Sequence, residues 1–212
     1  MSHPFGHIDD ETPLDDVSGL IPDIGSRREL NAHEAANVLD AVLLYFGGPV
    51  VPRDGIEFDY TWMTTVHRTM FGKVWKWAGT TRRHDVNIAV AVDWPQVQPQ
   101  LFDLCERIPY FLTTRRDPAA KPLTDIAYLH YELVRIHPFP NGNGRWSRFV
   151  ANVYQIRFAN TLTRWPVEMT GTAGDTSVLR TEYIAAMKSA DAGNHAPLVE
   201  LHERFTRPLP EM

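Results

Sequence analysis

The sequence contains a single cysteine and no long hydrophobic run among its 212 residues. One cysteine, Cys105, excludes an internal disulfide and a thiolate zinc cage, which agrees with a reducing, cytoplasmic compartment. The longest apolar stretches, such as residues 41–46 and 88–92, are much shorter than the ~20 residues of a membrane-spanning helix. The N-terminus also lacks the basic and then apolar pattern of a signal peptide. We therefore expect a cytoplasmic protein without a membrane segment.

Positive charge is also scarce. Lysine and arginine number 21 against 26 acidic residues, which gives a net charge of −5 and argues against nucleic acid as a partner. Apolar residues make up 43% and aromatic residues 11%, enough for one hydrophobic core. The expected organisation is an extended lead-in over residues 1–25, a single helical domain over residues 26–206 and a short tail over residues 207–212.

Apolar residues recur mostly at spacings of three and four, which predicts a mainly α-helical protein of about seven helices. Helices are expected to begin near residues 26, 58, 94, 124, 145, 179 and 198. For the first of them, residues 26–46, the predicted apolar stripe is Ala32, Ala35, Ala36, Leu39, Val42, Leu43 and Phe46. The alternation of Val86, Ile88, Val90 and Val92 predicts a short strand, one arm of a hairpin whose other arm lies upstream.

One loop between two predicted helices, residues 136–148 (IHPFPNGNGRWSR), has the composition of a binding site. His137 precedes a proline, which ends the preceding helix there. Gly142 and Gly144 allow close approach of a ligand to the main chain, and the amides that follow open a helix. Arg145 and Arg148 are three residues apart on one helix face. Together these features predict a polyphosphate site with a histidine at its edge.

Residues 137–148 resemble the signature of the Fic family: His, Pro-Phe, a variable residue, an acid, then Gly-Asn-Gly-Arg and a second Arg three positions on. Fic proteins are mainly helical enzymes that mostly transfer AMP from ATP to a hydroxyl of a target protein. The resemblance extends from about residue 25 to residue 202 and implies a Fic-type helical bundle with a small β-hairpin flap. The start of the first helix is similar to a subgroup called mobile mystery protein B.

The resemblance implies a role for each motif residue. His137 would be the general base that takes the proton of the incoming Ser, Thr or Tyr hydroxyl. The main-chain amides of residues 142–144 and the Asn143 side chain would bind the α- and β-phosphates. Arg145 would neutralise the β-phosphate, and Arg148 would hold the γ-phosphate of ATP.

A segment upstream of the motif occupies the place of the family's flap. Residues 77–79, Arg82 and residues 87–88 carry this part of the resemblance. The main chain around Arg83, Val86, Asn87 and Ile88 would pair with an extended segment of the target protein.

Asn141 departs from the family pattern, which has an acid here as a ligand for Mg²⁺. A carboxamide oxygen lacks the charge that attracts this cation, so metal binding is expected to be weaker or carried mostly by the phosphates of ATP. An alternative function is therefore a nucleotide-binding Fic relative with little or no turnover. A phosphotransferase or another nucleotidyltransferase is a further alternative. Gly144 favours AMP transfer, because the Doc relatives, which bind ATP reversed and transfer phosphate, have lysine there.

Glu29 admits two interpretations. Many Fic proteins carry an inhibitory helix whose glutamate pairs with the second arginine of the motif. Ser26 and Glu29 also have the spacing of a capping box, which needs no regulatory role. A separate inhibitory, antitoxin-like protein or no inhibitor at all is compatible with the second interpretation. A metal cluster of His67, His130 and His137 is conceivable, but their spacing does not support it, and His130 is expected in the core.

Overall fold

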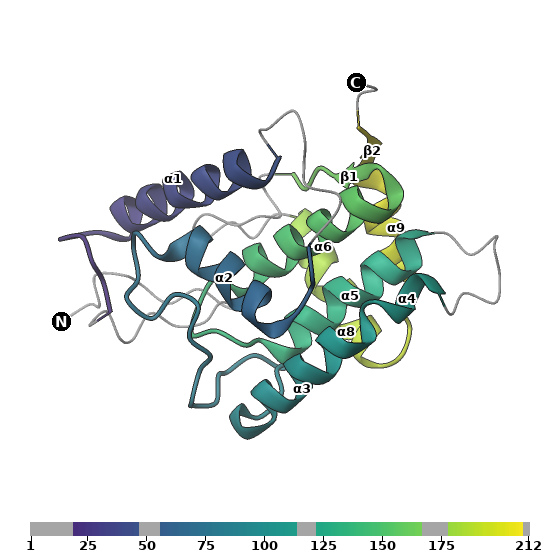
Figure 1. Ribbon diagram of the computed structural model, residues 1–212, viewed down its shortest axis with the longest axis horizontal. Coiled ribbons are helices and arrows are strands. Elements are labelled where there is room, and N and C mark those ends of the chain that lie inside the picture. Colours follow the sequence, from purple (N-terminus) through teal and green to yellow (C-terminus); the bar gives the residue numbers. More distant parts are fainter. Residues whose placement is uncertain (1–18, 47–55, 114–121, 167–177, 210–212) are drawn as a thin grey trace.

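The computed structural model describes residues 19–46, 56–113, 122–166 and 178–209 (Figure 1). Most of the predicted lead-in and the last three residues of the predicted tail lie outside these ranges. The described part is mainly helical, as predicted, with one small two-stranded sheet. No helix among these residues is long and apolar enough to cross a membrane.

Two long helices form the centre of the fold. Helix α5 (Pro122–Ile136) and helix α6 (Asn143–Ala159) pack against each other and are joined by the motif loop (Figure 1). Most residues of both helices are buried, because both also pack against further elements. The motif loop is therefore held between two well-anchored helices.

Three N-terminal helices cover one side of this pair. They are α1 (Arg27–Phe46), α2 (Tyr60–Phe71) and α3 (Trp94–Arg107), followed by the short α4 (Tyr110–Thr113). Asp59 caps α2 by accepting a hydrogen bond from the Trp62 amide (2.6 Å), and Gly72 ends it. Helix α2 packs against α1 and α6, and α3 packs against α5. The main hydrophobic core lies among these elements.

Helix α1 lies where it was predicted, but most of the predicted apolar stripe is wrong, and only Val42 and Phe46 of it pack against the main core. Its buried residues are Leu30, Glu34, Asn37 and Ala41, whereas Leu39 and Leu43 of the predicted stripe are 56% and 58% exposed. Polar groups can be buried on this face because each has partners. The Asn37 side chain donates to the Thr69 carbonyl and accepts from the Lys73 amide, both at 2.9 Å.

The C-terminal elements cover the other side of α5. Helices α8 (Val178–Asp191) and α9 (Ala196–Phe205) enclose a second, smaller core with α5. Strands β1 (Thr161–Thr163) and β2 (Thr206–Pro208) pair antiparallel, with Leu162 opposite Arg207.

The predicted strand around Val86–Val92 is wrong. Residues 80–93 of the structure form an irregular segment, and the only sheet in the described ranges is the β1–β2 pair. Exposure does alternate along residues 86–90, with Asn87 and Ala89 exposed and their neighbours half-buried. The alternation thus indicates one covered face, but no neighbouring strand among the described residues completes a ladder.

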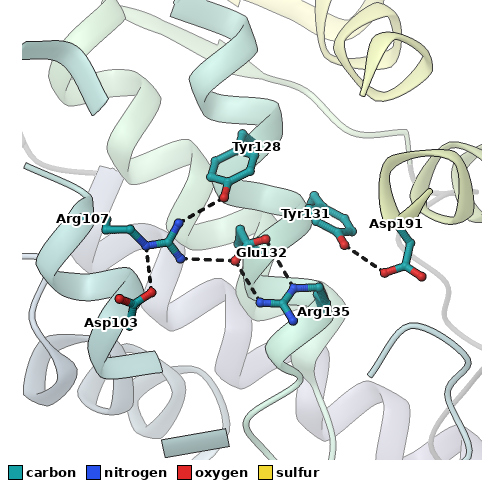
Figure 2. A network of polar contacts seen from close by, with 7 residues as sticks. All are labelled: Asp103, Arg107, Tyr128, Tyr131, Glu132, Arg135 and Asp191. Carbon is teal, nitrogen blue, oxygen red and sulfur yellow. Dashed lines mark hydrogen bonds and ion pairs between the residues drawn. The ribbon is translucent and has the colours of Figure 1, made fainter. Parts of the chain in front are cut away.

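A polar network fixes the outer face of α5 (Figure 2). The buried Glu132 lies between Arg107 of α3 (3.4 Å) and Arg135 (3.1 Å), and Tyr131 donates to Asp191 of α8 (2.9 Å). The Arg135 carbonyl also accepts a hydrogen bond from the Val92 amide (3.0 Å). The end of α5 that leads into the motif loop is therefore tied to three other parts of the chain.

Candidate functional site

His137 directly follows the last residue of α5 and is the first residue of the motif. Its φ is +48°, in the left-handed region, and only 7% of the residue is exposed. The Nδ1 atom lies 3.2 Å from the Val134 carbonyl oxygen, which can only accept, so Nδ1 carries the proton. The lone pair of the neutral ring is then on Nε2. Burial lowers the pKa of His137 to about 4, which keeps the ring neutral at neutral pH.

Arg82 holds the main chain that follows this histidine. Its Nε donates to the His137 carbonyl (2.7 Å), and its amide donates to the Pro138 carbonyl (2.8 Å). Two further guanidinium donors reach the carbonyls of His84 (2.8 Å) and Val92. The residue is 2% exposed, so one buried cation connects the motif loop to the irregular segment of residues 80–93.

The motif loop is closed by the side chain of Asn143. Its Oδ1 accepts from the Phe139 amide (2.9 Å), and its Nδ2 donates to the Phe139 carbonyl (2.7 Å). This reciprocal pair brackets a tight turn, and the Phe139 ring is buried in the core. The carboxamide that was predicted to bind phosphate therefore holds the loop closed in this structure.

His67 of α2 supports the same loop through a hydrogen bond and a ring contact. Its Nδ1 accepts from the Gly79 amide (3.0 Å), so its Nε2 donates to the Asn141 carbonyl (3.0 Å). The ring stacks on Phe139, with centroids 3.7 Å apart. His67 is thus a structural histidine, and the conceived metal cluster is not supported: the described residues contain no group of three or more His, Cys, Asp or Glu able to hold a metal.

Gly142 makes the turn into α6 possible. It is the N-cap residue with φ +80°, and a Cβ here would lie 2.7 Å from the Phe71 ring. Its own amide donates to the Asn141 side-chain oxygen (2.5 Å). The amides of Asn143, Gly144 and Arg145 follow in the first turn of α6, where a helix has no acceptor of its own for them. This helix start is the predicted anion site.

Arg145 is paired with an acid from α1. Its Nη2 lies 2.8 Å from the Glu34 carboxylate, and its guanidinium lies over the Phe71 ring at 4.7 Å. Glu34 is 4% exposed and also accepts from the indole of Trp75 (2.7 Å). The predicted β-phosphate ligand therefore has a carboxylate partner that sequence reasoning missed. No local signal indicates this pair, because its members are 111 residues apart.

Arg148 has a neutral partner instead. It is 7% exposed, and its guanidinium lies 5.7 Å from the ring centroid of Tyr183 on α8. Burial lowers the pKa of Arg148, and the polar interaction with Tyr183 opposes this shift. A Cβ built at Gly144 would lie 3.6 Å from the same guanidinium, so Arg148 faces the start of α6.

The remaining predicted site residues lie apart from this cluster. Arg83 and Asn87 are exposed on the irregular segment, and Val86 and Ile88 are half-buried there. Glu29 accepts from the Gly25 amide (2.9 Å), and its own amide donates to Ser26 (3.2 Å). Glu29 therefore has the contacts of the capping interpretation, and it is Glu34 of α1 that contacts the motif.

The chain is similar to known proteins in sequence and in fold. The model of the Fic/DOC family matches residues 57–155. A protein adenylyltransferase Fic of Drosophila persimilis is 27% identical over 173 residues, covering 81% of this chain and 31% of the relative. The protein adenylyltransferase fic-1 of Caenorhabditis elegans is 26% identical over 175 residues, with 81% and 32% covered. The chain thus spans about a third of the length of these curated relatives.

The fold is similar to that of the BepC protein of Bartonella tribocorum, solved with bound AMPPNP. That similarity has a TM-score of 0.66 at 19% identity and covers 96% of this chain and 99% of the solved chain.

Proposed function

We propose that this chain, which carries a Fic/DOC domain at residues 57–155, transfers AMP from ATP to a hydroxyl side chain of a target protein. The curated relatives named protein adenylyltransferase support this reaction. A nucleotide analogue bound to a protein of the same fold supports ATP as the donor. We further propose that the domain extends from residue 26 to residue 206 and that it resembles the mobile mystery protein B subgroup.

The observation that carries the proposal is the tautomer of His137 beside an anion-binding helix start. With its proton on Nδ1, the ring offers Nε2 as the base. Nε2 would take the proton of a Ser, Thr or Tyr hydroxyl while the hydroxyl oxygen forms a bond to the α-phosphorus. The bond from that phosphorus to the β-phosphate oxygen breaks, and pyrophosphate leaves. A pKa near 4 means that the base needs no deprotonation at neutral pH.

The phosphates would be held by main-chain amides and two arginines. The amides of the first turn of α6 suit the α- and β-phosphate oxygens, where negative charge shifts in the transition state. Arg145 would reach the β-phosphate, either keeping Glu34 or exchanging it for phosphate, and Arg148 would reach the γ-phosphate. This order directs the α-phosphorus toward His137.

The target would bind along the irregular segment. Residues 86–90 have one covered and one exposed face, and no strand within the described ranges pairs with them. Because Arg82 anchors both ends of this segment, an extended target chain beside Arg83, Val86, Asn87 and Ile88 would meet a preorganised edge. Main-chain pairing of this kind positions the acceptor hydroxyl without demanding much target sequence.

Magnesium fits the residues of this site poorly. A protein Mg²⁺ site uses one or two carboxylates together with substrate phosphates. Asn141 offers a carboxamide, and its oxygen already accepts the Gly142 amide at 2.5 Å. Mg²⁺ would thus arrive with ATP, held by its phosphates, and we assign no reaction step to it.

The same observation favours a second candidate function. Without a carboxylate for the metal, the domain would bind nucleotide and turn it over slowly. A domain with slow turnover would need no separate inhibitory, antitoxin-like protein, whereas a domain that transfers AMP rapidly would need one. For both functions we propose a cytoplasmic location, because the co-substrate would be ATP and the one cysteine is free and buried.

The test is a transfer assay in a lysate of the source cells, with ATP labelled at the α-phosphate in one arm and at the γ-phosphate in the other. AMP transfer predicts protein-bound label only from the α-position, and no label with His137→Ala. Label only from the γ-position would show phosphate transfer instead. No label from either, in a protein that binds ATP by calorimetry, would favour the nucleotide-binding function.

A further inference from the structure

Tyr183 connects Arg148 to a buried polar cluster behind the site. Its hydroxyl lies 3.1 Å from Nε2 of His130, and the two rings are stacked with centroids 5.7 Å apart. On its other side, the Arg148 guanidinium lies 5.7 Å from the centroid of the Tyr183 ring. The tyrosine therefore lies between a motif arginine and a histidine that does not touch the motif loop.

The contacts continue across the second core. Nδ1 of His130 lies 3.0 Å from Nε2 of His202, and Nδ1 of His202 lies 3.1 Å from the Thr163 hydroxyl. That hydroxyl donates to Oε1 of Gln155 at 2.7 Å. The chain of contacts joins α8, α5, α9, β1 and α6.

The donor direction follows from the arginine end. A guanidinium only donates, so beside Arg148 the Tyr183 oxygen can serve only as an acceptor, and its proton is directed at Nε2 of His130. Nε2 of His130 is then an acceptor, and its proton is on Nδ1. That proton is donated to Nε2 of His202, which places the proton of His202 on Nδ1.

The other end of the chain requires the same direction. The Gln155 amide nitrogen donates to the hydroxyls of Thr161 (2.9 Å) and Thr206 (3.1 Å), so its oxygen is the acceptor for Thr163. The Thr163 hydroxyl thus donates its proton to Gln155 and accepts a hydrogen bond from His202. Both ends agree on one polarity, and every link has one donor and one acceptor.

This direction of donation requires both histidine rings to be neutral, and their surroundings favour the neutral form. Each is fully buried. Burial lowers the pKa of His202 to about 3 and the pKa of His130 well below its ordinary value, where His202 and Arg148 lower it further. Each ring is therefore neutral and carries one proton, which it donates along the chain.

We propose that Tyr183 is a positioning residue for Arg148, oriented by the hydrogen-bond chain through His130, His202, Thr163 and Gln155, and that it sets the preference for nucleoside triphosphate over diphosphate. The inference rests on the proposed function, which assigns Arg148 to the γ-phosphate. Tyr183 would present its oxygen to the guanidinium because its proton is already committed to His130.

A neutral partner suits this purpose. Glu34 cancels the charge of Arg145 while it orients it, whereas Tyr183 supplies an acceptor and leaves the full positive charge of Arg148 for phosphate. The buried arginine is also restricted before the ligand arrives, so less side-chain entropy is lost on binding.

Calorimetric titration with ATP and with ADP tests the proposal on the wild-type protein, Tyr183→Phe and Tyr131→Phe. Tyr183→Phe keeps the ring and removes the hydroxyl. We expect it to weaken ATP binding about tenfold, the size of one net hydrogen bond, and to leave ADP binding within about twofold. Tyr131→Phe is the matched control, because its hydroxyl also joins α5 to α8 but contacts Asp191 (2.9 Å). It should change neither affinity.

Each outcome has a defined meaning. If Tyr183→Phe leaves the ATP preference intact while the α-label assay shows AMP transfer, the inference is wrong and the proposed function stands. If the preference is lost but no AMP transfer is found in the wild type, the positioning role stands and the proposed function fails. Equal wild-type affinities for ATP and ADP would overturn the positioning role together with the assignment of Arg148.

Nitrogen-15 NMR of the imidazole rings tests the polarity without any variant. Both His130 and His202 should be neutral at pH 7 with the proton on Nδ1. A proton on Nε2 of either ring would reverse the chain and contradict the argument for Tyr183.

Discussion

Replacing Arg82 should lower both the stability of the protein and its transfer activity, although Arg82 itself takes no part in the chemical step. Its guanidinium donates to the buried carbonyl of His137 and to the partly buried carbonyls of His84 and Val92. Arg82→Met removes all three donors and leaves the carbonyls without them. A buried orphaned group costs about 1–3 kcal/mol, and each of the two partly buried carbonyls is taken at about half of that, so we expect a loss of about 2–6 kcal/mol of unfolding free energy. This is a large fraction of the 5–15 kcal/mol of stability that is roughly typical of a domain.

Lysine should rescue only part of this loss. Arg82→Lys keeps the charge but lacks the planar fork that reaches three acceptors at once, so its stability should lie between those of the wild type and Arg82→Met. The matched control is Arg83→Met, which removes the same charge from the next, exposed residue and should stay within about 0.5 kcal/mol of the wild type.

Urea unfolding followed by tryptophan fluorescence measures these differences. Where the Arg82 variants remain folded, transfer should also fall strongly, because the peptide that follows His137 loses its anchor. An Arg82→Met protein within about 1 kcal/mol of Arg83→Met would refute the reasoning, since it would mean that water or other donors satisfy these carbonyls.

Three further predictions concern the metal, the Glu34 pair and pH. Asn141→Asp should raise the Mg²⁺ affinity and the transfer rate by about tenfold or more with little change in ATP affinity; an unchanged rate in a metal titration would show that the phosphates hold the metal adequately. Glu34→Gln should lower the stability of the nucleotide-free protein by about 1–2 kcal/mol and tighten ATP binding several-fold, because Arg145 keeps its charge but loses its carboxylate; weaker binding by calorimetry would contradict this. Burial lowers the pKa of His67 and His202 to about 3, so their stabilising contribution is complete above the unfolded pKa of about 6.5 and is lost as the pH falls from there toward 3. Each histidine should therefore lower the free energy of unfolding by about 2 kcal/mol between pH 7 and pH 5. Urea unfolding at the two pH values measures this, and equal stability at both would rule the effect out.

The short-range features of the site could be predicted from the sequence because local chemistry decides them. A proline after His137 ends α5 at Ile136, and Gly142 takes the positive φ from which α6 begins. Periodicity located the helices for a similar reason, since apolar spacing depends only on neighbouring residues.

Periodicity failed where a polar residue is buried by partners far away in the chain. On α1 it favoured Leu39 and Leu43, yet the helix buries Glu34 and Asn37. Hydrophobic patterning assumes that polar groups face water, and this assumption fails when the fold supplies their hydrogen bonds. The segment of residues 86–92 failed for the complementary reason: alternation indicates a half-covered chain, but a strand also needs a partner at its edge.

The sequence by itself thus determined the helical class, the motif loop and the chemical types available in it. Only the tertiary structure decided how those groups are held: Arg145 against Glu34 from a helix 111 residues earlier, His137 against Arg82, and Arg148 against Tyr183. The reason is physical. Backbone conformation around Pro138 and Gly142 is set by steric limits within a few residues, whereas the orientation and charge of a buried arginine depend on whichever acceptors the packed helices bring beside it.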